Sequence, residues 1–465
     1  MLVALKAIEM NETTDAVQIE KSPWWFRPWW IIGGMVVVLV IAAPFAYRGY
    51  RIAGLPDIGH PFDIEEFGTV EISDAENAFV EYRLAARAII ALPDADDDDL
   101  KKATKPETDW ADVKPNIRKW LEDNRATLKI WRQGTEKPKA VNHQPKDMNY
   151  DTLLPVIQEF RNFARLSGLE SKRLIAEGDV ESAWNWYRAA FRASRHSGRH
   201  GCMIERLVGV SVHNMVTMDL VHWSSNEDVD AEILQKAIKD LNADYLLTTQ
   251  NSDVYMTEFL AGRNELKSPD MILEFVDVPL GKFGVYLFNE MELNHRLNQQ
   301  IFANLMSQVD KRRNDRAILY SGTPDLFEVG PEDTGFSGQL EPQELEVFIE
   351  RSFYGGYLGT SYTQMDNAIS REQTKQACLI TLLASQWYQR DHGTFPEKLV
   401  DLVPKYLPKL QQDPFGQKGD RIRYSIDEEK AVFWSVGNNE TDDGGNIAEP
   451  DFLDYGLEIK LKTKD

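Results

Sequence analysis

Apolar residues recur three or four positions apart along most of the chain, which is the spacing of one face of an α-helix. The pattern is strongest from about residue 116 to residue 246, where polar residues separate the apolar ones. A helix before this stretch is expected to begin after Ser73-Asp74, whose side chains can cap its first amides, and to end at Pro93. A long helix is expected from about 285 to 319. The pattern predicts a mainly α fold.

The helical pattern stops in a segment rich in Gly, Pro and acidic residues, 321–342, which predicts a loop between two domains. Beyond this loop a second long helix is expected from Thr374 to a stop at Gly393, and strand-like runs separated by turns follow it. We therefore expect an irregular α-helical domain over 75–320. Over 343–465 we expect a long helix followed by a small α+β domain with an antiparallel sheet.

One segment near the N-terminus, 29–47, contains no charged residue. At about 1.5 Å per residue a helix of this length nearly spans a ~30 Å hydrocarbon layer, and aromatic residues such as Trp29 and Tyr47 flank it at headgroup level. We predict a single transmembrane helix over 29–47, preceded by a cytoplasmic segment, 1–28, and followed by a linker, 48–74. A cleaved signal peptide is the alternative, but the polar leader is long and the span offers no small-x-small cleavage site.

Acidic residues outnumber basic ones by 74 to 52, which gives a formal charge of -22. Such a charge repels the phosphates of nucleic acid, so no nucleic-acid partner is expected, whereas cations are attracted. The chain has only two cysteines, Cys202 and Cys378. Two cysteines exclude a disulfide framework but leave a single bridge possible.

A short stretch in the helical region, from Gly178 to Phe191, resembles one unit of a tetratricopeptide-like helical hairpin. Gly178 would end one helix, and Ala183, Tyr187 and Ala190 would line the packing face of the next. No second copy follows at a fixed period, so the alternative is a pair of packed helices in an irregular bundle. Both interpretations predict that helices on either side of Gly178 pack together.

His196 and His200 lie four positions apart, with Cys202 and Glu205 close behind them. If one helix continued through both histidines they would share a face and could bind zinc, which makes this segment the candidate site of an envelope hydrolase. However, the spacing lacks the His-Glu-x-x-His arrangement, and Gly198 indicates a helix end between the two histidines. No nucleophile-elbow motif, phosphate loop or dinucleotide fingerprint occurs in the chain, which favours a protein that is not an enzyme.

The end of the chain carries several motifs in a distinctive order. A helix ends in Tyr-x-x-x-x-Gly-x-Phe-Pro, and Leu-x-x-Leu, Asp-Pro-Phe-Gly, a strand tyrosine, Ser-x-Gly-x-Asn and an acidic Gly-Gly loop follow. The positions are Tyr388, Gly393, Phe395, Pro396, Leu399, Leu402, Asp413, Pro414, Phe415, Gly416, Tyr424, Ser435, Gly437, Asn439, Asp442, Asp443, Gly444 and Gly445. This order resembles the globular domain of the major pseudopilin, protein G, of type II secretion systems. The resemblance implies a helix packed against a small antiparallel sheet.

The resemblance also implies a loop that binds calcium. Carried over by position, the ligands would be Ser435 through its backbone carbonyl, Asn439, Asp442 and Asp443. Carboxylates, an amide oxygen and carbonyls suit Ca²⁺, which takes six to eight oxygen ligands at about 2.3–2.6 Å. Asn439 stands where the family usually has Asp, which removes one negative charge. The alternative is an acidic turn that binds no metal.

The resemblance fails at the start of the chain. A pseudopilin has a Gly-Phe-Thr-Leu-x-Glu-like site directly before its apolar helix, whereas Arg27-Pro28 precede the span here and the span contains no Glu. Polymerisation as a pilin is therefore not expected. Our hypothesis is a single-pass protein of the bacterial inner membrane, with its C-terminal bulk in the periplasm, that contacts an unidentified envelope protein. An accessory component of a type II secretion or pilus-like system is the alternative.

Overall fold

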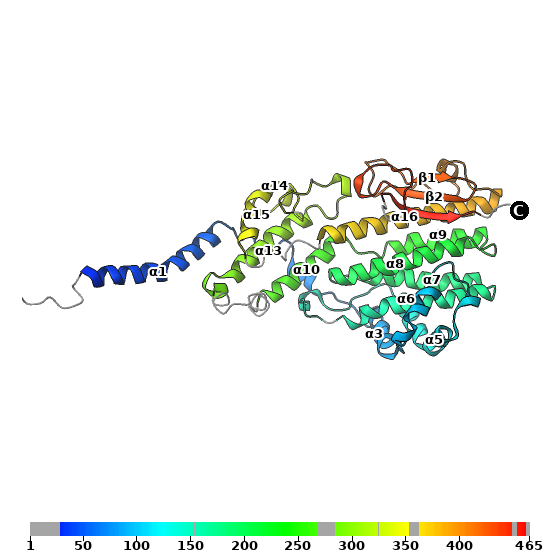
Figure 1. The fold of residues 1–465 in the computed structure, drawn as a ribbon, viewed down its shortest axis with the longest axis horizontal. Coiled ribbons are helices and arrows are strands. Elements are labelled where there is room, and N and C mark those ends of the chain that lie inside the picture. Colours follow the sequence, from blue (N-terminus) through cyan, green and yellow to red (C-terminus); the bar gives the residue numbers. More distant parts are fainter. Residues whose placement is uncertain are drawn as a thin grey trace, which may run out of the picture.

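The computed structural model describes residues 28–152, 154–267, 284–323, 325–352, 362–448 and 453–461. The first helix, α1 (Pro28–Ala53), projects away from the rest of the molecule (Figure 1). Its segment Trp29–Ala53 contains an 18-residue window with a mean hydropathy of 2.2 and is long and apolar enough to cross a membrane. None of this apolar window is buried inside the protein. The predicted apolar helix is confirmed, and it extends past the predicted end at residue 47.

The predicted linker contains structure of its own. Asp63 caps the short helix α2 (Ile64–Gly68), since its carboxylate accepts hydrogen bonds from the amides of Glu65 and Glu66, both at 3.0 Å. The next helix, α3 (Phe79–Ala88), begins later than Ser73-Asp74 predicted. The reason is that Asn77 exchanges hydrogen bonds with the backbone of Val141, which holds the chain outside the helix at this point.

Amphipathic helices then form a bundle in which α5, α6, α7 and α8 pack on one another in order and α9 packs on α7. Gly178 adopts a left-handed conformation (φ 81°) between α6 and α7, and Asp179 caps α7 by accepting a hydrogen bond from the amide of Ser182. Large aromatic pairs fill the core, such as Trp184 stacked on Trp223 with ring centroids 5.5 Å apart. The helices are α4 (Asp97–Ala103), α5 (Pro115–Thr135), α6 (Pro155–Ala176), α7 (Val180–His196), α8 (Met203–Ser224), α9 (Ala231–Tyr245) and α10 (Asn251–Glu265).

A second hydrophobic core lies between the bundle and α1. It includes Phe259 of α10 and Phe302 of α13 (Glu290–Met306), whose ring centroids are 5.6 Å apart. The predicted helix over 285–319 is wrong at both ends, because Asn289 is left-handed (φ 53°) and tertiary hydrogen bonds from other segments hold the chain after Met306. For example, the amide of Ser252 donates to the Asp310 carboxylate. Two short helices follow, α14 (Pro331–Thr334) and α15 (Pro342–Arg351).

The C-terminal part consists of one long helix and a three-stranded antiparallel sheet. The helix α16 (Tyr362–His392) starts before the predicted Thr374 and stops at Gly393, which is left-handed (φ 78°), as predicted. The strands lie in the order β1 (Arg423–Ile426), β2 (Lys430–Ser435), β3 (Tyr455–Lys460). The mainly α fold with a small C-terminal antiparallel sheet is thus confirmed.

The helix α16 is covered on two sides. The sheet packs on one side of it, and α8 and α9 pack on the other (Figure 1). Residues in its middle are completely buried in consequence, among them Cys378, Leu379 and Leu382. The predicted segments 75–320 and 343–465 therefore share one hydrophobic core.

Candidate functional site

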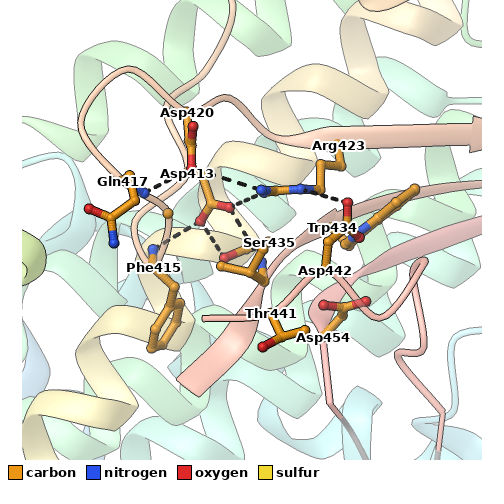
Figure 2. A network of polar contacts seen from close by, with 12 residues as sticks. Asp413, Phe415, Gln417, Asp420, Arg423, Trp434, Ser435, Thr441, Asp442 and Asp454 are labelled. Atoms are coloured by element: carbon orange, nitrogen blue, oxygen red, sulfur yellow. Dashed lines mark hydrogen bonds and ion pairs between the residues drawn. The ribbon is translucent and has the colours of Figure 1, made fainter. Parts of the chain in front are cut away.

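The turn Asp413-Pro414-Phe415-Gly416 sits at the centre of a polar network in the C-terminal part (Figure 2). The carboxylate of Asp413 is completely buried and accepts hydrogen bonds from the Ser435 hydroxyl and from the amides of Phe415 (2.9 Å) and Val436 (3.3 Å). Gly416 is required by space, because a Cβ there would lie 2.9 Å from Cγ of Asp413. The motif thus buries a charge and surrounds it with donors.

Arg423, the first residue of β1, supplies the positive charge of this network. Its Nη1 lies 2.6 Å from Oδ2 of Asp413, and its Nε lies 3.0 Å from Oδ2 of Asp442. Its Nη2 lies 3.8 Å from Oδ2 of Asp420. One guanidinium therefore faces three carboxylates, as Figure 2 shows for Asp413 and Asp442.

Asp442 also accepts hydrogen bonds from the indole Nε1 of Trp434 (2.9 Å) and the amide of Gly444 (3.1 Å). Partial burial raises the pKa of the Asp442 carboxyl, but these donors and the charge of Arg423 outweigh burial and hold its pKa below the ordinary value. The carboxylate is therefore ionised at neutral pH and held in place from three directions.

Asp454 closes the other end of the acidic loop. Its carboxylate accepts hydrogen bonds from the amides of Gly445 (2.8 Å) and Asn446 (3.2 Å). Desolvation raises the pKa of Asp454 in spite of these hydrogen bonds. Sequence reasoning missed both Asp454 and Arg423, because the turns and loops that bring their partners to them are set by the folded chain.

Of the four residues predicted to bind calcium, Ser435 ends β2, and Asn439, Asp442 and Asp443 lie in the segment that follows it. The hydroxyl of Ser435 donates to Asp413, and the amide nitrogen of Asn439 donates to Oδ2 of Asp443 at 2.7 Å, which turns a donor rather than an oxygen toward that carboxylate. Asp442 is occupied by Arg423 and an indole. Across the ranges that the structure describes, no group of three or more His, Cys, Asp or Glu residues could hold a metal ion. The side chains of Asn439, Asp442 and Asp443 are thus engaged with other groups of the protein.

The same turn joins the C-terminal part to the second core. Nη2 of Arg312 donates to the carbonyls of Gly416 (2.7 Å) and Gln417 (2.8 Å). The side-chain amide of Asn314 donates to the backbone carbonyl of Phe415 (2.9 Å). The guanidinium of Arg313 lies over the Phe415 ring, 4.9 Å from its centroid. The motif therefore also works as a docking surface within the chain.

The residues predicted for a hydrolase site do not come together. Helix α7 ends at His196, and the chain turns at Gly198 (φ 85°), so the two histidines do not share a helix face. His196 is completely buried, with Nδ1 2.8 Å from the Tyr82 hydroxyl, whereas the His200 ring packs beside Phe67. The Glu205 carboxylate accepts hydrogen bonds from Asn142 and from the amide of Cys202, which caps α8. Both cysteines are free and buried, so the single bridge left open by the sequence is absent.

A buried ion triad ties the two parts of the larger core together. Glu372 of α16 pairs with Arg195 of α7 and Arg206 of α8, and all three side chains are almost completely inaccessible. Desolvation alone would raise the pKa of Glu372, but the two guanidinium groups hold it well below its usual range. With no opening to solvent, this triad has a structural role.

A cavity of about 340 Å³ lies where the second core, the start of α16 and the C-terminal loops meet. Arg313 and Arg316 share the Asp366 carboxylate at its wall, at 3.0 and 2.5 Å. Aromatic rings of Tyr255 and Tyr362 provide apolar surface. The size suits a small ligand, but the two guanidinium groups of the wall already pair with Asp366.

In comparisons with known proteins, the chain matches no family model, no curated protein and no solved structure.

Proposed function

We propose that this chain is a single-pass protein of the bacterial inner membrane that holds an acidic helical body in the periplasm, where the body contacts another envelope protein. The observation that carries the proposal is α1, whose apolar surface is exposed along its length while its C-terminal end is locked to the body. An exposed apolar helix of this length is costly in water and suits a lipid layer.

Charged side chains hold the C-terminal end of α1 against the body. Arg51 of α1 pairs with Glu290 of α13, and its Nη2 also donates to the Arg351 carbonyl at 2.7 Å. Arg296 donates to the carbonyls of Ile52 (3.3 Å) and Leu55 (3.0 Å). Such a connection favours a body held close to the membrane in one orientation rather than on a flexible tether.

The charge of the chain supports a protein partner rather than the lipid surface. A formal charge of -22 disfavours contact with anionic headgroups and favours a partner that presents basic residues. We propose no catalytic step, because the histidine and carboxylate groups that the sequence singled out lie apart or are engaged in capping and packing.

The arrangement of α16 bears on the alternative, an accessory component of a secretion or pilus-like system. A helix packed against an antiparallel sheet is what the pseudopilin resemblance implies. Since α8 and α9 cover the other side of α16, this helix has no free face with which to pack into a pilus. Co-purification with pseudopilins from native membranes would favour the accessory role, and their absence from a stable complex would favour the first proposal.

A pair of variants tests the membrane anchor. Changing Val38 and Leu39 of α1 to Arg places two charges in the apolar span, each at a cost of about 2.5–3.5 kcal/mol. The control changes Leu84 and Ile90 to Arg, because both are half exposed on the body. The parent and the control should stay in carbonate-washed membranes, and the α1 variant should be lost from them. A parent that is released by carbonate, or an α1 variant that stays, would contradict the proposal.

A further inference from the structure

We infer that Arg423 is an internal cation that closes the C-terminal part of this chain by linking Asp413 to Asp442, so that this part does not depend on a divalent metal. The residues expected to bind calcium make other contacts: Asp442 pairs with Arg423, and Asn439 donates to Asp443.

The position of Arg423 carries the inference. Its guanidinium lies between Asp413, which belongs to the turn before β1, and Asp442, which belongs to the loop after β2 (Figure 2). The distances of 2.6 and 3.0 Å are those of charge-assisted hydrogen bonds. A bound cation that linked two segments of the chain would perform the same task.

The charges around the guanidinium explain why a cation is needed there. Asp413 is completely buried and cannot be solvated, and a buried charge without a partner is strongly destabilising. Asp442 and Asp420 add negative charge on the open side. Because the guanidinium is planar and presents several donors in fixed directions, it can satisfy more than one carboxylate at once.

The backbone of the acidic loop, 436–448, fits closely around these contacts. Gly437 is left-handed (φ 67°), and a Cβ there would lie 2.2 Å from the carbonyl oxygen of Leu453. Gly445 is also left-handed (φ 82°) and packs against the indole of Trp434, whose Nε1 donates to Asp442. Trp434 and Arg423 lie opposite each other in the sheet register, so the strand pairing itself delivers both donors to the same carboxylate.

The test compares the thermal unfolding of the full chain in detergent with EDTA and with millimolar Ca²⁺. The unfolding midpoint of the parent should be the same in both. Arg423→Gln should lower the midpoint in EDTA by about 4 °C or more. Arg421→Gln is the matched control, because it makes the same charge change two residues away, and Arg421 forms no ion pair within the described residues.

Removal of the guanidinium in Arg423→Gln leaves the carboxylates of Asp413 and Asp442 without their cation. Ca²⁺ that restores part of the lost midpoint in this variant would support the role of Arg423 as an internal cation. A parent stabilised by Ca²⁺ would overturn the inference, as would an Arg423→Gln variant that unfolds at the temperature of the control. If Arg423→Gln does not fold, Asp442→Asn serves instead, because it removes one carboxylate but keeps the guanidinium. Its unfolding midpoint, like that of the parent, should be the same in EDTA and in Ca²⁺.

Discussion

The guanidinium of Arg51, at the end of the apolar helix α1, is paired with the carboxylate of Glu290, the first residue of α13. Both side chains are buried, with 7% and 0% of their surface exposed. This pair connects the apolar helix α1 to the second core and lies at the point where α1 meets the body.

Glu290→Gln should loosen the connection between α1 and the body. Removal of one partner of a buried ion pair costs about 3–5 kcal/mol, because the other charge stays buried. Hydrogen exchange of the amides around Leu55 should accelerate in this variant. Glu181→Gln is the control, since its ion pair with Lys236 lies at the surface, away from α1, and should be worth less than 1 kcal/mol. Equal exchange in both variants would contradict the role of the Arg51 pair.

Glu372→Gln should destabilise the larger core, because Arg195 and Arg206 would remain buried without a carboxylate. We expect a loss of about 3–5 kcal/mol in the free energy of unfolding, measured with denaturant. Replacing all three residues with apolar side chains of similar size should cost less than this single change. If the single variant were as stable as the parent, the triad would contribute nothing to the packing of α16 on α7 and α8.

Stability should fall as the pH drops below 6.5. Burial lowers the pKa of His196 and of His213 to about 3, so these side chains stay neutral in the folded protein while the unfolded chain takes up protons. Each histidine should then cost about 1.4 kcal/mol per pH unit between pH 6 and pH 4, and nothing above pH 7.5. Urea unfolding at several pH values measures the slope. His196→Asn should reduce it by about 1.4 kcal/mol per pH unit, and an unchanged slope would rule out His196 as a source.

Alanine variants of two glycines in the acidic loop distinguish the cost of a steric clash from the cost of a left-handed backbone. Gly437 and Gly444 are both left-handed, with φ of 67° and 74°, but only Gly437 has an atom within reach of an added Cβ. Gly444→Ala should therefore cost only the left-handed strain of about 1–2 kcal/mol. Gly437→Ala should cost clearly more, because its Cβ would meet the Leu453 carbonyl. Similar losses for the two variants in denaturant unfolding would show that the loop moves away from β3 without penalty.

Local patterns in the sequence were enough to predict the apolar helix, the helical bundle and the small C-terminal sheet. The end of α16 at Gly393 is an example, because a left-handed glycine ends a helix whatever the tertiary packing around it. The start of α3 and the end of α13 could not be predicted in this way. Hydrogen bonds from distant segments decide them, such as those between Asn77 and Val141.

The candidate site also has a part that could be predicted from local sequence and a part that could not. Sequence reasoning singled out Ser435, Asn439, Asp442 and Asp443, and the structure shows Asn439 hydrogen-bonded to Asp443 in the segment after β2. It could not assign Arg423 a partner, because the contact with Asp442 depends on the register of β1 and β2. A basic residue flanked by carboxylates in an acidic segment was the signal available in the sequence.

The measurement that tests the account most directly is the labelling of single cysteines by a membrane-impermeant maleimide in cells with a permeable outer membrane. The two native cysteines are buried, and burial raises the pKa of the Cys202 thiol to about 12, so their background reaction should be slow. Val400→Cys lies on the exposed surface of the C-terminal part, and Thr13→Cys lies in the segment before α1. If the body is periplasmic, Val400→Cys is labelled in cells with an intact inner membrane and Thr13→Cys is labelled only after that membrane is opened. Labelling in the reverse order, or equal labelling of both, would contradict a periplasmic body.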